Sequence, residues 1–242
     1  MKTLVACLAA GFSSLACAGE FGVSPLRVDL DRGTRSALVT VSNEDERVLA
    51  FQIRAMQWTQ DEAGADRYQD TAELVYFPRQ LKIPPKERRV VRVGYKAPAL
   101  QAEKAYRLYI EELADPNRSP TQTGVAITLR FGVPVFLRPP SASLAGEMQL
   151  SVEPGAALAL VRNTGNVHFR FANVRYSALG ASGETLLEQS LGGWYLLAGA
   201  ERPYRLVLPP ALCAQAKLLR AEAAAEGLSL LAERALEPGD CR

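Results

Sequence analysis

The chain has 242 residues, a formal net charge of +2 at neutral pH and 48% hydrophobic residues. This length suits one large domain or two ordinary domains, each with its own hydrophobic core. The near-zero charge is unlike that of proteins that bind nucleic acid or an anionic membrane surface through a basic patch, so we expect neither partner.

The first 18 residues are typical of a cleaved secretory signal peptide. Lys2 gives a positive start, residues 4–15 form a short apolar core, and residues 16–18 (Ala-Cys-Ala) offer a cleavage site with small residues. A lipoprotein signal is a less favoured alternative, because Leu15 stands one position too close to Cys17. The apolar run is too short for a comfortable membrane span, and no later run is long enough. We therefore predict export, with no membrane insertion.

Alternation of apolar and polar residues dominates the first half of the chain. This is the pattern of half-buried strands. We expect strands at residues 23–30, 36–42, 48–56, 74–77, 88–95 and 105–113, with turns or loops at 31–33, 43–46, 61–66 and 115–121. Short strands at this spacing predict a β-sandwich.

The most informative segment is a long alternating stretch over residues 124–137. Val125, Ile127, Leu129 and Phe131 would lie on one face of a strand. Pro134 cannot donate a ladder hydrogen bond, so an edge strand or a bent strand is expected. An exposed edge with large apolar side chains invites aggregation, unless it serves to pair with another chain. A strand whose side chains face its own core would give the same pattern.

Residues 139–143, which begin with two prolines, predict a linker to a second β-rich half. We expect strands there at residues 147–153, 157–162, 168–177, 185–189, 194–197 and 204–208. Residues 214–226 have a helix-favouring composition, but their position favours strand, which we prefer. Cys213 and Cys241 remain as a pair after signal cleavage, and a disulfide between them is the simple interpretation for an exported protein.

Residues that could carry enzyme chemistry are sparse. His168 is the only histidine, so a catalytic triad or a multi-histidine metal site would have to include it. No common metal-binding, dinucleotide-binding or phosphate-binding motif occurs, and the acidic loop at 61–66 is interpreted as a solvated turn. Glu111 and Glu112 are neighbours in a strand and would face opposite ways, unlike a catalytic carboxylate pair. We expect no enzyme activity, no metal and no cofactor.

Three segments of the first half have an informative order and spacing. Arg27 stands between apolar residues of the first strand; residues 77–94 contain Phe-Pro, then Ile-Pro-Pro, then Arg-Val-Val-Arg-Val-Gly; and residues 106–113 (Tyr-Arg-Leu-Tyr-Ile-Glu-Glu-Leu) precede the long alternating strand. Together they resemble the periplasmic pilus chaperones, the PapD-like family of chaperone–usher systems. The resemblance covers most of residues 21–140. It implies an all-β fold of two immunoglobulin-like β-sandwich domains, residues 19–138 and 139–242, at an angle with a cleft between them.

The resemblance also implies a function. Such a chaperone folds and caps pilin-type subunits in the periplasm by donor-strand complementation, then delivers them to an outer-membrane usher without ATP. Val125, Ile127, Leu129 and Phe131 match the donor residues that fill the groove of an incomplete subunit. The implied partners are pilin or fimbrial subunits and the usher, and the free protein could self-associate through its donor strand.

Arg27 matches the family's arginine that binds the C-terminal carboxylate of the subunit, a role that a planar guanidinium suits. The best-known branch has a second anchor, a lysine on the donor strand, but the matching position here is Pro134. The surrounding Val-Pro-Val-Phe sequence (residues 133–136) resembles the archaic branch instead. We expect Arg92 to supply the second positive charge, with Arg130 as a weaker candidate because it points away from the donor row.

Glu112 and Arg138 match residues that form a charged contact across the family's domain junction. The main alternative function is a β-sandwich structural or adhesive subunit of a surface assembly. Such a subunit would usually be one domain with a disordered donor segment, whereas this chain begins with structured alternation. A carbohydrate-binding or hydrolytic sandwich would need clustered aromatic residues or a carboxylate pair. A chaperone for a non-pilus coat polymer is compatible with all these residues.

Overall fold

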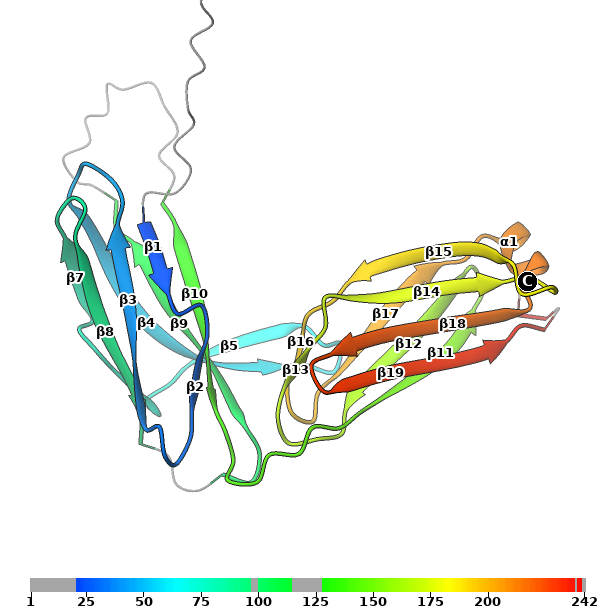
Figure 1. The fold of residues 1–242 in the computed structure, drawn as a ribbon, viewed down its shortest axis with the longest axis horizontal. Coiled ribbons are helices and arrows are strands. Elements are labelled where there is room, and N and C mark those ends of the chain that lie inside the picture. Colours follow the sequence, from blue (N-terminus) through cyan, green and yellow to red (C-terminus); the bar gives the residue numbers. More distant parts are fainter. Residues whose placement is uncertain (1–20, 97–99, 115–127, 238, 241–242) are drawn as a thin grey trace, which may run out of the picture.

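The alternating segments form strands that build two β-sandwiches set at an angle to each other (Figure 1). This computed structural model describes residues 21–96, 100–114, 128–237 and 239–240. The strands of the first sandwich are β1 (Phe21–Ser24), β2 (Val28–Leu30), β3 (Ser36–Asn43), β4 (Leu49–Gln60), β5 (Asp66–Asp70), β6 (Leu74–Phe77), β7 (Gln80–Ile83), β8 (Arg88–Tyr95), β9 (Lys104–Glu112) and β10 (Arg130–Leu137). The all-β, two-sandwich architecture predicted from the sequence is confirmed.

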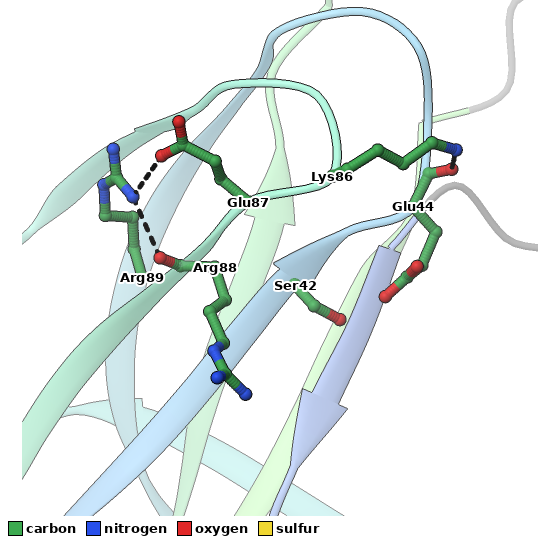
Figure 2. Close-up of a pocket in the computed structure, with 6 residues that line it drawn as sticks. All are labelled: Ser42, Glu44, Lys86, Glu87, Arg88 and Arg89. Atoms are coloured by element: carbon green, nitrogen blue, oxygen red, sulfur yellow. Dashed lines mark hydrogen bonds and ion pairs between the residues drawn. The ribbon is translucent and has the colours of Figure 1, made fainter.

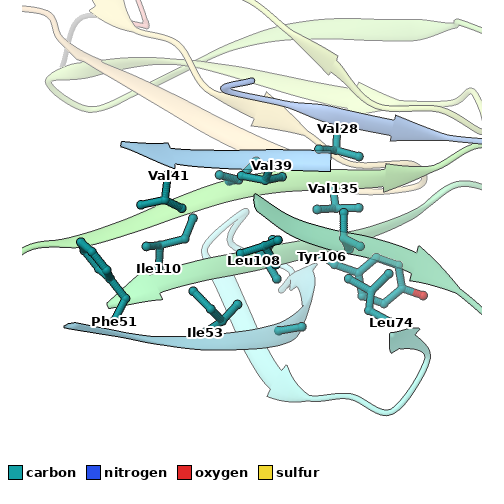
Figure 3. Packing of buried hydrophobic residues seen from close by; sticks show 14 of the residues in the cluster. Val28, Val39, Val41, Phe51, Ile53, Leu74, Tyr106, Leu108, Ile110 and Val135 are labelled. Atoms are coloured by element: carbon teal, nitrogen blue, oxygen red, sulfur yellow. The ribbon is translucent and has the colours of Figure 1, made fainter. Parts of the chain in front are cut away.

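Two sheets face each other in the first sandwich. One has the order β1-β3-β8-β6 and is called the β3 sheet here; the other, the β10 sheet, has the order β2-β10-β9-β4-β5, with β7 also paired to β4. Their inward side chains form the core, in which Val39 and Val41 of β3 face Leu108 and Ile110 of β9 (Figure 3). The period of two in the sequence therefore corresponds to one buried and one outward face on each strand.

The predicted first strand, residues 23–30, is divided between the two sheets. β1 pairs antiparallel with β3, and β2 pairs parallel with β10. The division falls at Pro25, which has no backbone N–H to donate to a ladder, and at the exposed Leu26. A single alternating pattern therefore covers a strand that changes sheets.

The β4–β5 hairpin is longer than the sequence suggested and extends toward the second sandwich (Figure 1). β4 continues past the expected end at residue 56 as far as Gln60, and the turn at 61–65 follows. β5 and β7 were not predicted, because β5 has little apolar content and β7 is only four residues long.

The second sandwich contains β11 (Gly146–Glu153), β12 (Ala156–Asn163), β13 (Phe169–Arg170), β14 (Asn173–Leu179), β15 (Thr185–Gly192), β16 (Tyr195–Leu196), β17 (Glu201–Val207), α1 (Pro210–Gln215), β18 (Leu218–Ala225) and β19 (Leu228–Ala235). Its main sheets have the orders β11-β12-β17 and β15-β14-β18-β19, and β13 pairs with β16. The predicted strand at 168–177 is interrupted, giving β13 and β14. The strand preference for residues 214–226 is confirmed over 218–225, while 214 and 215 end the short helix.

Cys213 lies buried in α1 and is disulfide-bonded. The other three cysteines of the chain lie outside the described residues, so its pairing with Cys241 stays a prediction. No helix in the described ranges is long and apolar enough to cross a membrane.

A small third core joins the two sandwiches. Trp58, Ala105 and Phe136 of the β10 sheet pack there with Leu197, which follows β16. The side chain of Gln60, at the end of β4, donates to the carbonyl of Tyr195 at 2.9 Å and accepts from the backbone N–H of Leu197 at 2.9 Å. Trp194 Nε1 donates to Asp66 Oδ2 at 2.9 Å. Apolar contacts and hydrogen bonds thus connect the two sandwiches at this junction.

Candidate functional site

One edge of the β10 sheet is open along half a strand. β10 pairs with β9 from Arg130 to Leu137, but on its other side β2 begins to pair only at Val135. Between Arg130 and Pro134 that edge has no neighbouring strand among the described residues. The sequence expectation that Pro134 marks an edge strand agrees with this arrangement, because Pro134 is the last residue before β2 joins.

The apolar row of β10 leaves the core along its length. Val133, Val135 and Leu137 are buried, whereas Phe131 is 36% exposed and Leu129, just before the strand, is 39% exposed. The other two predicted donor residues, Val125 and Ile127, lie outside the described residues. The row faces its own core at the C-terminal end, while Leu129 and Phe131 stand at the open edge, so strand donation by this row stays a prediction.

Two arginines flank the point where the open edge ends. Val28 pairs with Val135, so Arg27, one residue earlier in the same parallel register, lies beside Pro134. On the other side of β10, Arg107 of β9 is the direct partner of Pro134. Because Val28 and Val135 point into the core, Arg27 and Arg107 project from the outward face of the β10 sheet. Arg27 is half-exposed, and its Nε donates to Asp29 Oδ2 at 2.9 Å.

Arg107 is unusual because its guanidinium is buried and no carboxylate of the described residues pairs with it. The residue is 8% exposed, Nη1 donates to the carbonyl of Gly132 at 3.2 Å, and Nε has no hydrogen-bond partner. Its Cζ lies 4.0 Å from the ring centre of Trp58, and the rings of Trp194 and Tyr195 are 5.9 and 5.8 Å away. Aromatic faces partly stabilise a cation, but a buried charge favours an anionic partner.

Arg107 was not predicted as a site residue from the sequence. The signal available was an arginine inside the apolar alternation of residues 105–113, next to Tyr106, but nothing local showed that it pairs with Pro134. Tyr68 lies on the same side of this cluster, where burial and then the Asp66 carboxylate raise the pKa of its hydroxyl to about 12.

The structure does not bring Arg92 together with Arg27. Arg92 lies on β8, in the opposite sheet, and its guanidinium donates to Ser36 Oγ at 3.0 Å. Its direct neighbours across the strands are Leu38 and Phe77, which are 57% and 75% exposed. Arg92 therefore belongs to an exposed, mainly apolar patch on the outward face of the β3 sheet.

Arg130 points away from the row of Leu129 and Phe131, as expected. It pairs with Glu111 at 2.7 Å, and its Cζ lies 3.7 Å from the ring centre of Tyr109. Since Arg130 already has a carboxylate partner, it is a weaker candidate than Arg107 for binding a second one.

The predicted contact between Glu112 and Arg138 is wrong. Glu111 pairs with Arg130 at one end of the β9–β10 ladder, and Lys104 pairs with Leu137 at the other, so Glu112 and Arg138 are separated by the length of the strands. Glu112 Oε2 accepts the backbone N–H of Leu129 at 3.3 Å. The Nε of Arg138 instead lies 3.5 Å from Asp29 Oδ1 and 3.9 Å from Glu103 Oε2.

His168 lies at the domain junction and is buried. Its Nδ1 is 2.6 Å from Glu103 Oε1, and its ring stacks on Phe136 with 3.6 Å between ring centres.

In the acidic loop at 61–66, Asp61 makes its polar contacts within the loop and with β5. The backbone N–H of Ala65 and the guanidinium of Arg67 hold the pKa of Asp61 below its usual value. Within the described ranges no three His, Cys, Asp or Glu side chains gather as metal ligands.

A hollow lies at the loops of the first sandwich (Figure 2). It is lined by Ser42, Glu44, Lys86, Glu87, Arg88 and Arg89. Lys86 donates to the carbonyl of Glu44 at 2.6 Å, and Arg89 pairs with Glu87 at 2.6 Å. These charges are mostly satisfied locally, unlike Arg107.

Comparison with known proteins agrees with this geometry. Residues 20–143 match the family described as pili and flagellar-assembly chaperone, PapD N-terminal domain. No curated protein sequence matches the chain.

Among solved structures, the chain is similar to the CsuC–CsuE chaperone–tip adhesion subunit pre-assembly complex from archaic chaperone–usher Csu pili of Acinetobacter baumannii. Identity is 20% and the TM-score 0.62, over 89% of this chain and 98% of that one. It is also similar to the CupB2 chaperone of Pseudomonas aeruginosa, at 20% identity and TM-score 0.54 over 89% and 100% of the two chains. The chain is also similar to the class 5 fimbriae chaperone CfaA. Identity is 15% and the TM-score 0.59, over 89% of this chain and 99% of that one. These structural matches establish the fold. Because the family model covers more than half of the sequence, the chain belongs to the family of pili and flagellar-assembly chaperones.

Proposed function

We propose that this protein is a periplasmic chaperone that folds and caps pilin-type subunits by lending them a strand, and then delivers them to an outer-membrane usher. The observation that carries the proposal is the open half of β10, where an apolar row leaves the core beside an unpaired strand edge. Two of the similar solved structures are described as a chaperone bound to a tip adhesion subunit and a chaperone bound to a pilin. Strand pairing and strand exchange make and break no covalent bond, so the proposal includes no enzyme activity.

Strand addition gives such a complex both its affinity and its register. Backbone groups of residues 130–134 would hydrogen-bond to the subunit, and Leu129 and Phe131 would fill apolar positions in its groove. Val125 and Ile127 extend the same row in the sequence and would add to it. Fully burying one such side chain contributes about 1.5–3 kcal/mol before the costs of association.

We propose Arg27 and Arg107 as the two groups that bind the C-terminal carboxylate of the subunit. Both flank Pro134 on the outward face, and Arg107 has no anionic partner among the described residues. A guanidinium in a partly dry site binds a carboxylate more strongly than one in water. Arg107 would thus replace the lysine that the best-known branch carries at the position of Pro134, in place of the expected Arg92.

The remaining predictions follow from this role. Residues 1–18 would direct export to the periplasm, residues 19–138 and 139–242 would form the two domains, and Cys213 would pair with Cys241. Release would occur when the N-terminal extension of an incoming subunit replaces β10. Exchange between similar strands needs no ATP if the final pairing buries more apolar area.

The test is a periplasmic pull-down with the tagged mature protein, read by mass spectrometry. We expect the native protein to retain a small secreted β-subunit, and Arg27→Ala, Arg107→Met and Leu129→Arg each to lower its recovery about tenfold or more, which corresponds to about 1.4 kcal/mol. Arg107→Met replaces a buried charge by an apolar chain of similar length, so the fold should persist.

Two matched variants serve as controls. Arg92→Ala removes an arginine from the opposite sheet, and Leu231→Arg places a charge at an exposed leucine of the second sandwich. Both should retain the subunit, and circular dichroism should show that all variants are folded. The proposal would be overturned if the native protein recovered no subunit. It would also be overturned if Arg27→Ala, Arg107→Met and Leu129→Arg all recovered as much subunit as the native protein. A native protein found incorporated in a surface fibre would support the structural-subunit alternative instead.

A further inference from the structure

A row of charged side chains connects Arg27 to the second sandwich. Arg27 Nε bonds Asp29 Oδ2 at 2.9 Å, and Asp29 Oδ1 lies 3.5 Å from Arg138 Nε. The same Nε lies 3.9 Å from Glu103 Oε2, and Glu103 Oε1 contacts the second sandwich through His168. The chain of contacts therefore extends from the proposed carboxylate site to the domain junction.

Arg138 sits between two carboxylate oxygens and bonds neither of them well. Asp29 Oδ1 and Glu103 Oε2 are both buried and accept no hydrogen bond from the described residues. Their separations from Arg138 Nε exceed the 2.7–3.2 Å of a normal N–H···O bond. A buried acceptor without a donor is costly, and one N–H can satisfy only one of the two oxygens. The Nε–H of Arg138 can therefore be drawn toward either Asp29 or Glu103.

Each of these two contacts has a different consequence at its far end. Glu103 Oε1 accepts the backbone N–H of His168 at 3.0 Å and contacts its ring at 2.6 Å, so this carboxylate holds the second sandwich. Asp29 holds Arg27, and a carboxylate arriving at Arg27 would compete with Asp29 for the guanidinium. Once Asp29 has lost that contact, it attracts Arg138 more strongly and draws it from Glu103.

We propose that Arg138 couples carboxylate binding at Arg27 to the junction between the sandwiches, with Asp29 as the residue that positions Arg27. This inference rests on the proposed function, because it takes Arg27 as an anchor for the carboxylate of the subunit. Binding at the first sandwich then changes the contact that holds the second, and by linkage the state of the junction changes the affinity of the anchor equally.

The test compares two synthetic peptides of alternating serine and valine, one with a free C-terminal carboxylate and one with a C-terminal amide. Isothermal titration of the full mature protein gives the affinity ratio of the two, called here the carboxylate preference. We expect Glu103→Gln to raise this preference several-fold, because Arg138 is then free to satisfy Asp29 and to release Arg27. Arg138→Gln should lower it, because Asp29 then has Arg27 as its remaining cation.

The decisive measurement repeats Glu103→Gln and Arg138→Gln in an Asp29→Asn background. Coupling through Asp29 predicts that both effects disappear there. A simple Coulomb effect of the altered charges would persist, and its persistence would overturn the proposal. Glu103→Gln and Asp29→Asn preserve side-chain shape, so these two variants decide the question even if Arg138→Gln does not fold.

The same data separate failure of the coupling from failure of the anchor. If Arg27→Ala abolishes the carboxylate preference but Glu103→Gln leaves it unchanged, the anchor stands and the coupling is refuted. If the native protein binds both peptides equally, or binds neither, the anchor and the coupling both fail.

Discussion

Single buried polar residues organise the loops of both sandwiches. Asn43, at the end of β3, donates from Nδ2 to the carbonyls of Arg47 at 2.6 Å and Ile83 at 2.8 Å. Asn163, at the end of β12, makes the equivalent bond to the carbonyl of Val167, four residues ahead, at 2.8 Å. Both are almost fully buried, and both donate to backbone carbonyls of the adjoining loop. The sequence predicted a turn at 43–46, but local composition could not show that its asparagine points inward.

Glu73 provides a pH-dependent contribution to stability. Hydrogen bonds from Lys104 and then from Tyr106 hold the pKa of its carboxyl below the ordinary 4.5. A lowered folded-state pKa means that the stabilisation is complete above that ordinary value and is lost as the pH falls through the folded-state value. We expect Glu73→Gln to lower the free energy of unfolding at neutral pH by up to about 1 kcal/mol, since the pair is partly exposed.

Urea unfolding of the native protein and of Glu73→Gln at a series of pH values checks this expectation. The two curves of stability against pH should converge in acid. A difference that stays constant down to strongly acidic pH would show that the loss comes from packing and not from the charge.

At the level of strands, β10 shows what alternation can and cannot predict. The period of two predicted that Leu129 and Phe131 share one face of the strand, and Pro134 indicated an edge. The point at which the row leaves the core depends on where β2 begins to pair, and that depends on the change of sheet near Pro25. The pairing of Val28 with Val135 joins segments more than a hundred residues apart, and a local pattern does not encode it. The position of Arg107 opposite Pro134, on which its proposed role depends, was missed for the same reason.

The two halves of β10 should respond differently to truncation. Val133→Ala removes fully buried methyl groups and should lower the free energy of unfolding by about 2 kcal/mol. Phe131→Ala acts at the open edge, so it should cost less stability although it deletes more atoms, and it should weaken capture of the subunit. Urea denaturation together with the pull-down measures both effects. Equal or greater destabilisation by Phe131→Ala would mean that Phe131 belongs to the core of the free protein.

For the whole molecule, the sequence implied two sandwiches at an angle only through the family resemblance, and it misassigned the contact between them. Composition and alternation predict strands, but the junction uses residues without a distinctive local pattern. Gln60 is one of these, since its amide bonds the backbone of Tyr195 and Leu197 from the tip of the β4–β5 hairpin.

Gln60→Ala should therefore broaden the distribution of angles between the sandwiches and leave each of them folded. Small-angle scattering of the mature protein should show a wider distribution of overall dimensions. Gln52→Ala is the matched control, because Gln52 lies on the same strand but bonds within the first sandwich, to the carbonyl of Arg79. An unchanged scattering profile for Gln60→Ala would mean that the apolar contacts of Trp58, Phe136 and Leu197 are sufficient to fix the angle.

The division of β10 into a buried half and an open half has a consequence for the register in which a partner strand would pair with it. A shift of β10 by one residue would turn Arg130 toward the core and Val133 outward, so the packing of Val133, Val135 and Leu137 fixes the strand in one position. Leu129 and Phe131 then stand at set distances from Arg27 and Arg107, about 3.3 Å for each residue along the strand. In the proposed complex, the core of the first sandwich would therefore set the position of the donor side chains relative to the two arginines. One residue inserted after Gly132 would shift Leu129 and Phe131 relative to Arg27 and Arg107, so we expect it to weaken capture of the subunit.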